Sequence, residues 1–159
     1  MSLIGQFNAK LDSKNRVFLP AVFRRALQPE RQDGKDAEFT LVLRKDFFEN
    51  CIVIYPEEQW RAEVDKVRSK LNRFDSVQQM VYRKLVSEAL EVTIDSNGRM
   101  LVPRDLLDRV GIGQDVLFVG MENTIELWSP AVAGQNSRDG EAFMSDAEFA
   151  AGIKGFMAE

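Results

Sequence analysis

Two short polar segments of the chain place an aspartate and an arginine at the same spacing. Asp12 is followed four positions later by Arg16, and Asp95 is followed four positions later by Arg99. An arginine guanidinium carries five N–H donors in a planar fork that fits a phosphate group or the major-groove edge of guanine. Because one carboxylate accepts only about two of these donors, each arginine can pair with its aspartate and still bind a ligand.

The polar residues between each aspartate and its arginine are typical of tight turns. Asn97-Gly98 favours a hairpin turn with positive φ angles. In such turns an aspartate accepts hydrogen bonds from nearby backbone N–H groups. We therefore expect Asp12, Asp95 and Gly98 to shape the turns. The two arginines either complete the turns or bind a ligand, and the two roles are compatible.

Other residue types narrow the possible chemistry. The chain contains no histidine, which removes the usual general base, proton shuttle and zinc ligand. Its one cysteine, Cys51, permits neither an intrachain disulfide nor a cysteine metal cluster, and no glycine loop of the Walker type is present. We therefore expect no catalytic residue, no metal and no cofactor. The remaining enzymatic alternative is a carboxylate pair, Asp12 with Asp95, if the two turns meet in space.

Charge is distributed unevenly along the chain. The overall net charge is −4, which disfavours a polyanionic partner. Residues 8–25, however, hold five basic residues against one acidic residue, and the basic ones are Lys10, Lys14, Arg16, Arg24 and Arg25. Residues 91–110 hold three basic and four acidic residues, and residues 131–159 hold two and five. If the ligand is a nucleic acid, the first turn is the primary contact. The second turn is then either a supporting contact or the scaffold that completes the first.

The two segments belong to an internal repeat. Residues 11–20 align with residues 94–103 at an offset of 83, with Asp, Ser, Arg and Pro at equal positions. A short apolar pattern of helical spacing follows each proline. Two apolar runs typical of paired strands come next, at 39–43 and 51–55 in the first copy and at 116–119 and 124–128 in the second. Each copy therefore predicts a strand, a turn, a strand, a short helix and a strand pair.

The stretch between the copies has a helical period. After Pro56 an apolar stripe is formed by Trp60, Val64, Val67 and Leu71. A second helix is expected to begin near Asp75-Ser76, and the spacing of Ser76 to Gln79 is that of a capping box. These features predict a helical hairpin whose apolar stripes serve as core or as subunit contacts.

The last part of the chain loses the repeat pattern. Residues 134–140 predict a loop or disorder, and residues 142–157 predict a weak helix. The first residues lack the features of a signal peptide, and no segment reaches the roughly 20 apolar residues of a membrane span. Together with the single cysteine, these features predict a cytoplasmic protein.

These residues resemble the MraZ family of bacterial transcription factors, which is itself similar to the AbrB-like swapped-hairpin proteins. The resemblance covers residues 4–128 and is carried by the doubled turns, the helical insert and the ending of the second copy at 119–128. It implies an α+β fold in which two pseudo-symmetric swapped-hairpin β halves form one double-split β-barrel-like domain, joined by a two-helix hairpin. The implied parts are a first β half at 1–56, the helical insert at 57–90, a second β half at 91–130 and an acidic C-terminal tail at 131–159, partly disordered or weakly helical.

The resemblance also implies a function. It implies a sequence-specific, nucleoid-associated transcriptional regulator that forms ring-shaped homo-oligomers. Such a regulator binds repeated boxes in the promoter of the division and cell-wall gene cluster, including its own gene, and has no membrane or small-molecule partner. Asn15 departs from the glycine usual in the family, but asparagine also tolerates positive φ. The residues expected at the DNA face are Lys10, Lys14, Asn15, Arg16, Asn97 and Arg99.

A two-stranded β ribbon can enter the major groove, which gives the turns a physical route to base readout. One turn would bind weakly, so several copies presented together are expected to supply the affinity. The alternative is an oligomeric ring that serves as a protein-interaction scaffold without specific DNA binding. Salt dependence separates the two, because phosphate neutralisation lowers log K by about 0.9 per contact per log unit of salt.

Overall fold

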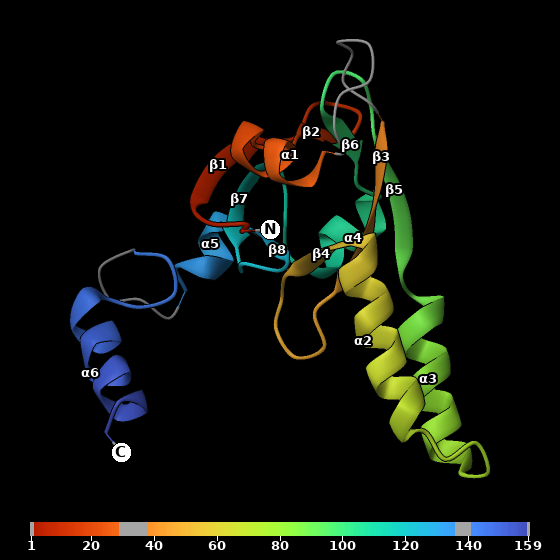
Figure 1. Ribbon diagram of the computed structural model, residues 1–159. Coiled ribbons are helices and arrows are strands. Elements are labelled where there is room, and N and C mark those ends of the chain that lie inside the picture. The colour runs from red at the N-terminus through yellow and green to blue at the C-terminus, as the bar shows by residue number, and fades with distance from the viewer. Residues whose placement is uncertain (1, 29–37, 136–140, 159) are drawn as a thin grey trace.

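The structure is a computed structural model that describes residues 2–28, 38–135 and 141–158. Its strands are β1 (Gln6–Lys10), β2 (Arg16–Phe18), β3 (Phe39–Lys45), β4 (Ile52–Pro56), β5 (Leu90–Ile94), β6 (Arg99–Leu101), β7 (Asp115–Gly120) and β8 (Ile125–Trp128). Its helices are α1 (Ala21–Leu27), α2 (Glu57–Lys70), α3 (Ser76–Ser87), α4 (Arg104–Arg109), α5 (Pro130–Ala133) and α6 (Asp146–Phe156). The protein is therefore mixed α+β, with antiparallel strands and several helices (Figure 1).

Both sheets contain strands from both sequence copies. One sheet has the order β1-β7-β8-β4-β3-β5, and β2 pairs with β6 in a separate two-stranded ribbon. The first strand of each copy thus pairs with the third strand of the other copy: β1 pairs with β7, and β5 pairs with β3. The expected strand pairs β3–β4 and β7–β8 are confirmed. Each copy is completed by strands of the other copy.

The strands on either side of each turn do not form a hairpin, which corrects the expectation drawn from Asn97-Gly98. β5 leads into the second turn and pairs with β3, whereas β6 leaves the turn and pairs with β2. The turn itself is tight, because Gly98 donates its N–H to the Asp95 carbonyl at 2.9 Å. Pairing across the copies buries Val17 and Met100, each 1% exposed, in the common core. Burial of these apolar side chains favours the exchange of strands.

The core is shared by both copies. Its fully buried large side chains include Phe23 and Ile54 from the first copy and Leu107 and Phe118 from the second. Phe7 packs edge-on against Phe23, with ring centres 5.2 Å apart. Removing a core phenylalanine of this kind destabilises a protein by about 3–5 kcal/mol. Because this core combines side chains of both copies, the two copies depend on one another for their stability.

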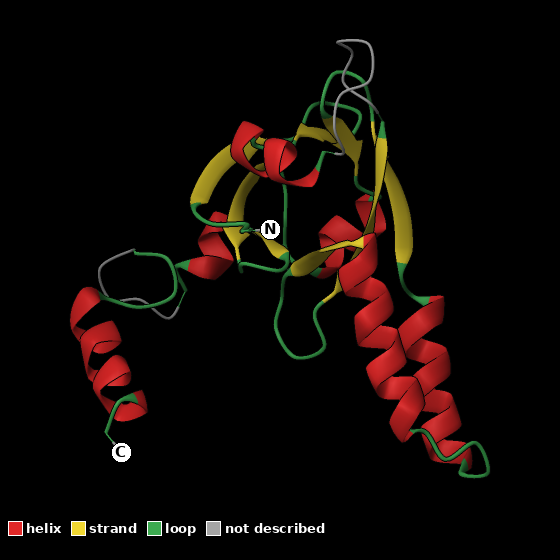
Figure 2. Ribbon diagram, viewed as in Figure 1, coloured by secondary structure: helices red, strands yellow, loops and turns green. Residues whose placement is uncertain are grey.

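Helices α2 and α3 form the hairpin expected between the copies, and they extend away from the strands (Figure 2). Trp60 packs edge-on against Tyr55 at 5.1 Å, and Val64 and Leu85 are buried. The cap of α3 differs from the expected Ser76. Asp75 caps the helix, because its carboxylate accepts the N–H groups of Val77 and Gln78. Aspartate and serine are similarly favoured as N-cap residues, and an acidic side chain is also favoured there by the helix dipole.

Arg44 of β3 ties the helical hairpin to the sheet. Its side chain is buried, and it donates from Nε to the Leu85 carbonyl at 3.1 Å and from Nη2 to the Lys84 carbonyl at 3.3 Å. These carbonyls lie in the last turn of α3, where a cation is favoured by the helix dipole. Toward the N-terminus of α3 the apolar side chains are open to solvent, since Val77 is 70% exposed and Val81 is 60% exposed.

The C-terminal region continues the chain with two helices. Ser129 caps α5, and Phe143 packs on Trp128 with ring centres 5.2 Å apart. The weak helix expected at 142–157 is present as α6, and Ser145 and Glu148 form a capping box at its N-terminus. Part of the loop expected at 134–140 lies outside the described residues. No helix in the described part of the chain is both long enough and apolar enough to cross a bilayer.

Candidate nucleic-acid interface

The first turn is organised by the Asp12 carboxylate. Its Oδ1 accepts the backbone N–H groups of Lys14 and Arg16, both at 2.9 Å, and its Oδ2 accepts Arg16 Nε at 2.8 Å. Asn15 has a φ of 62°. The turn survives the replacement of the usual glycine, because asparagine tolerates this left-handed conformation better than other side chains do.

The second turn repeats this geometry. Asp95 Oδ1 accepts the N–H groups of Asn97 and Arg99 at 2.9 and 3.0 Å, and Oδ2 accepts Arg99 Nε at 3.2 Å. Gly98, with a φ of 83°, occupies the place that Asn15 has in the first turn. Both aspartates therefore accept backbone N–H groups of their own turns.

These hydrogen bonds also determine the charge of the turns. Backbone N–H groups, first that of Arg16, lower the pKa of Asp12 from its ordinary value. The backbone N–H of Arg99 has the same leading effect on the pKa of Asp95. Both carboxylates are thus ionised and hold the Nε side of each arginine. Within the described residues, no hydrogen bond to protein occupies the Nη atoms of Arg16 or Arg99.

The two turns lie at opposite ends of the β2–β6 ribbon. Val17 pairs with Met100 at its centre. At one end Leu19 donates its N–H to the Gly98 carbonyl at 2.9 Å, and at the other end Val102 donates to the Asn15 carbonyl at 3.0 Å. The ribbon thus presents both turns as parts of one surface. Asp12 and Asp95 are bound within their own turns and do not form the carboxylate pair of the enzymatic alternative.

The outer face of the ribbon carries two arginines and two apolar side chains. Alternation along a strand places Arg16 and Phe18 on the face opposite Val17, and Arg99 and Leu101 on the face opposite Met100. Phe18 is 59% exposed and Leu101 is 54% exposed. These two residues were not among the predicted site residues, although their position two places after each arginine was a signal that could have identified them.

Each turn is also supported by an arginine of the other copy. Arg104 of α4 donates from Nη1 to Asn15 Oδ1 at 3.3 Å and to the Gly113 carbonyl at 3.0 Å. Its Nη2 donates to the Ile112 carbonyl. In the other direction, the guanidinium of Arg24 of α1 occupies the space beside Gly98. These contacts position the turns against the body of the protein.

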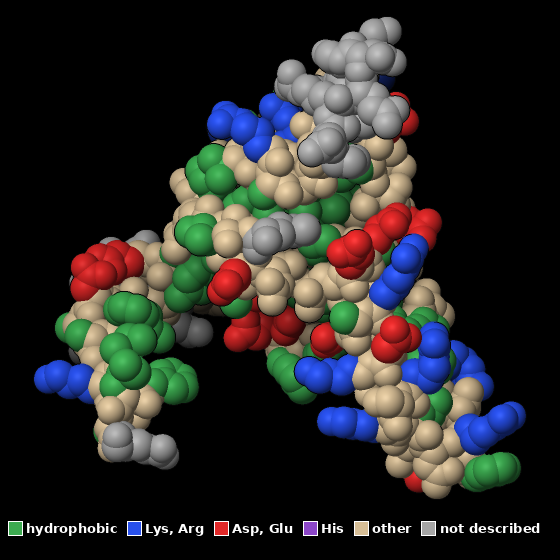
Figure 3. Space-filling model, in the orientation of Figure 1, with side chains coloured by type: hydrophobic (Ala, Val, Ile, Leu, Met, Phe, Trp, Pro, Cys, Tyr) green, Lys and Arg blue, Asp and Glu red, His purple; other side chains and the backbone are tan. Residues whose placement is uncertain are grey.

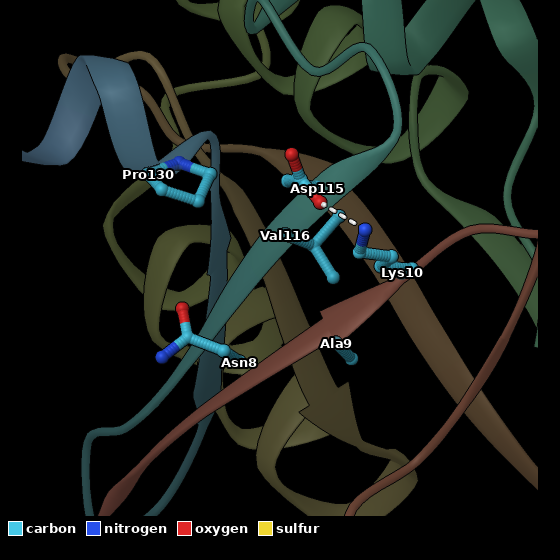
Figure 4. A pocket seen from close by; sticks show the side chains of 6 residues that line it. All are labelled: Asn8, Ala9, Lys10, Asp115, Val116 and Pro130. Carbon is cyan, nitrogen blue, oxygen red and sulfur yellow. Dashed lines mark ion pairs between the residues drawn. The ribbon is translucent and has the colours of Figure 1, made fainter.

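Five of the six predicted DNA-face residues lie at the two turns. Lys14, Asn15 and Arg16 lie at the first turn, whereas Asn97 and Arg99 lie at the second turn. Lys10 lies apart from them on β1, where its Nζ is 3.8 Å from Asp115 Oδ1 across the β1–β7 ladder (Figure 4). Figure 3 shows basic side chains gathered over α1, the helix that contains Arg24 and Arg25. This basic surface adjoins β2.

One trio of potential metal ligands occurs in the described part of the chain, formed by Asp46, Cys51 and Glu126. Asp46 Oδ2 already accepts the N–H groups of Phe48 and Glu49. Glu126 Oε1 accepts a hydrogen bond from Trp128 Nε1 at 3.0 Å. Burial raises the pKa of the Cys51 thiol well above its usual range, and it also raises the pKa of Glu126. The closeness of these three side chains is therefore accounted for by the hydrogen bonds of the loop and the packing of the strands.

Comparison with known proteins adds to this geometry. A family model described as "MraZ protein" matches residues 3–84 and 85–136. A protein of Phocaeicola vulgatus named "Transcriptional regulator MraZ" is 45% identical over 84% of this chain and 82% of its own length. A protein of the same name from Bacteroides fragilis is 40% identical over 98% of this chain and 91% of its own length. One from Clostridium tetani is 35% identical over 79% of this chain and 80% of its own length.

Proposed function

Since the chain belongs to the MraZ family, we propose that it binds double-stranded DNA as a sequence-specific transcriptional regulator. Its relatives are named for regulation and not for an enzymatic activity. The observation that carries the proposal is the pair of arginines on one ribbon. Each is held through Nε by a turn aspartate, and among the described residues none accepts a hydrogen bond from its Nη atoms. A guanidinium held in this way can donate two parallel hydrogen bonds to guanine O6 and N7 or to a phosphate.

The shape of this surface supports the proposal. A two-stranded antiparallel ribbon fits the major groove, which is about 12 Å wide. The fixed guanidinium groups lose little side-chain entropy on binding, because the aspartates already orient them. In this proposal Arg16 is the primary contact, with Lys14 and Asn15 beside it. Arg99 and Asn97 supply the supporting contact, and Lys10 adds positive charge at the β1 edge.

The assembly and the targets form the finer part of the proposal. Several copies arranged as a ring would present several ribbons to repeated boxes in the promoter of the division and cell-wall gene cluster, including the chain's own gene. Linked sites raise the apparent affinity through effective concentration. The pairing of β1, β2, β5 and β6 with strands of the other copy supports a swapped-hairpin, barrel-like arrangement of two β halves, with the helical insert and acidic tail as additions. The site of action would be the nucleoid in the cytoplasm.

The second candidate function is a ring that binds protein partners without reading DNA. The observation that favours it is a set of exposed apolar side chains away from the ribbon. Phe48, in the loop between β3 and β4, is 93% exposed, and Val77 and Val81 of α3 are also exposed. In the DNA-binding proposal the same residues would serve as subunit contacts.

A gel-shift titration of the full chain on its own upstream DNA tests the proposal. The parent is expected to give a specific band whose affinity falls as salt rises, because phosphate contacts release counterions. Arg16→Ala is expected to abolish this band without changing the oligomer size measured by light scattering. Arg61→Ala is the matched control, since Arg61 lies on α2 with its side chain 74% exposed. Binding by Arg16→Ala equal to that of the parent contradicts the site, and the absence of a salt-dependent specific band favours the scaffold.

A further inference from the structure

Phe18 and Leu101 are exposed at equivalent positions of the two copies. They are separated by the same 83 residues as Arg16 and Arg99. Both lie on the outer face of the ribbon, and more than half of each side chain is open to solvent. Nothing in the described core requires them, because Val17 and Met100 already fill the inner face. Exposed apolar side chains that recur beside cations on one face mark a binding surface more often than singly scattered exposed residues do.

The ladder places each apolar side chain opposite an arginine. Arg16 is the partner of Leu101, and Phe18 is the partner of Arg99. The guanidinium carbon of Arg99 lies 5.9 Å from the centre of the Phe18 ring. Directly opposed residues of an antiparallel pair have Cβ atoms about 4.5–5.5 Å apart. The ribbon therefore presents two neighbouring pairs, each made of one cation and one apolar group, related by the repeat.

This pairing of chemistries matches the major groove. Guanine offers O6 and N7 as acceptors for arginine, and the thymine C5-methyl is the apolar group that the groove exposes. Successive bases on one strand are about 3.4 Å apart along the axis, so long side chains on opposed positions can reach adjacent base pairs. The two arginines make double-stranded DNA the fitting occupant, because an apolar partner would leave their charges unpaired and desolvated.

We propose that Phe18 and Leu101 are specificity-determining residues, an inference that rests on the proposed function. Phe18 would contact a thymine methyl group beside the guanine bound by Arg99, and Leu101 would contact one beside the guanine bound by Arg16. Each half of the ribbon then reads two adjacent base pairs. The arginine identifies guanine, and the apolar side chain distinguishes thymine from the other bases. The contact buries the methyl group together with part of an otherwise solvated side chain.

The direct test compares two DNA duplexes with the unmodified chain. One is the chain's own upstream region, and the other is the same duplex with every thymine replaced by deoxyuridine. Deoxyuridine lacks only the C5-methyl and keeps the O4 acceptor and the phosphates. We expect Kd to rise on the uracil duplex by about fourfold for each contacted methyl, the factor for burying one methyl group. Equal Kd values on the two duplexes overturn the inference while leaving the proposed function intact.

Variants assign the effect to the two residues. Phe18→Ala and Leu101→Ala are expected to bind both duplexes and to lose part of the thymine preference, and the double variant is expected to lose it all. Phe156→Ala is the control, because Phe156 lies at the end of α6 and is 87% exposed; it is expected to keep the full preference. A double variant that binds more weakly but keeps the thymine preference overturns the assignment, since the residues then only support the arginines. If the parent shows no specific binding to either duplex, the proposed function itself fails.

Discussion

The guanidinium of Arg24, in the helix that follows the first turn, fills the space that a side chain at Gly98 would need in the second turn. In the opposite direction, Arg104 follows the second turn and donates to Asn15 in the first turn. Each turn is therefore held against the protein by the other copy. The surface proposed to meet DNA is built on these reciprocal contacts.

Gly98→Ala tests this support. Gly98 has a φ of 83°, and an added methyl group would overlap the Arg24 guanidinium. The left-handed conformation costs a non-glycine residue about 1–2 kcal/mol, and Arg24 must also move. We expect the free energy of unfolding, measured by urea denaturation, to fall by about that amount.

The control for this measurement is Gly152→Ala. Gly152 lies within α6 and has nothing within 4 Å of the added methyl group. Alanine is favoured over glycine in a helix by about 1 kcal/mol, so the stability should be unchanged or slightly higher. A Gly98→Ala protein that is as stable as the parent would contradict the proposed packing of Arg24.

Arg16→Lys separates the shape of the guanidinium from its charge. Lysine keeps the positive charge but cannot donate two parallel hydrogen bonds to one base edge. A bidentate contact contributes about 1–3 kcal/mol of discrimination, so specific DNA binding should weaken by roughly 5- to 150-fold. Binding to unrelated DNA and the slope of log K against log salt should change little, because the phosphates meet the same charge.

Arg99→Lys is expected to have the same kind of effect but a smaller one, since the residues around Arg99 carry less positive charge. Arg61→Lys, on α2, should leave both specific and unrelated DNA binding at parental levels. If Arg16→Lys binds the specific duplex as tightly as the parent does, the arginine acts as a simple point charge and the bidentate contact is wrong.

The turn aspartates predict a pH dependence of stability. The pKa values of Asp12 and Asp95 are lowered in the folded protein, chiefly by backbone N–H donors. A lowered folded pKa stabilises the protein above the unfolded pKa, and this stabilisation is lost as pH falls through the folded pKa. The contribution of the turns should therefore be constant from pH 8 to about 5 and decrease below about pH 4.

Denaturation of the parent and of an Asp12→Asn, Asp95→Asn double variant at several pH values checks this dependence. Near neutrality the double variant should be less stable than the parent, and the difference should shrink in acid. A difference that stays constant from pH 7 to pH 3 would show that the carboxylate charge has no part in holding the turns.

Cys51 is expected to be unreactive in the folded protein. Its side chain is fully buried, and burial raises the pKa of its thiol, so little reactive thiolate forms at neutral pH. An aromatic disulfide reagent should label no thiol in the native chain over minutes and one thiol per chain in guanidinium chloride. Stoichiometric labelling of the native chain at the rate of the unfolded chain would contradict this burial.

Much of the local structure follows from the sequence repeat. Turn residues at equal positions predicted the carboxylate-centred turns, because short polar side chains bond to nearby backbone whatever surrounds them. The helical period after Pro56 predicted α2, and the apolar runs predicted the β3–β4 and β7–β8 pairs. These features depend on interactions between residues that are close in the chain.

The partners of β1, β2, β5 and β6 could not be predicted in this way. Each is a short strand with apolar residues on the face that it buries. The local sequence pattern does not show whether such a strand pairs with a strand of its own copy or of the other copy. The positions of Arg24 and Arg104 depend on that choice, so they were also beyond reach. Phe18 and Leu101 were within reach, since strand alternation places them on the same face as the arginines.

The pairing of Lys10 with Asp115 has a consequence for synthesis of the protein. β1 leaves the ribosome early, but its partner strand begins more than a hundred residues later. At about 5–20 residues per second, β1 waits on the order of ten seconds with its backbone N–H and C=O groups unpaired. During translation this open edge can accept β7 from a neighbouring nascent chain as well as its own, so exchange between chains competes with correct folding.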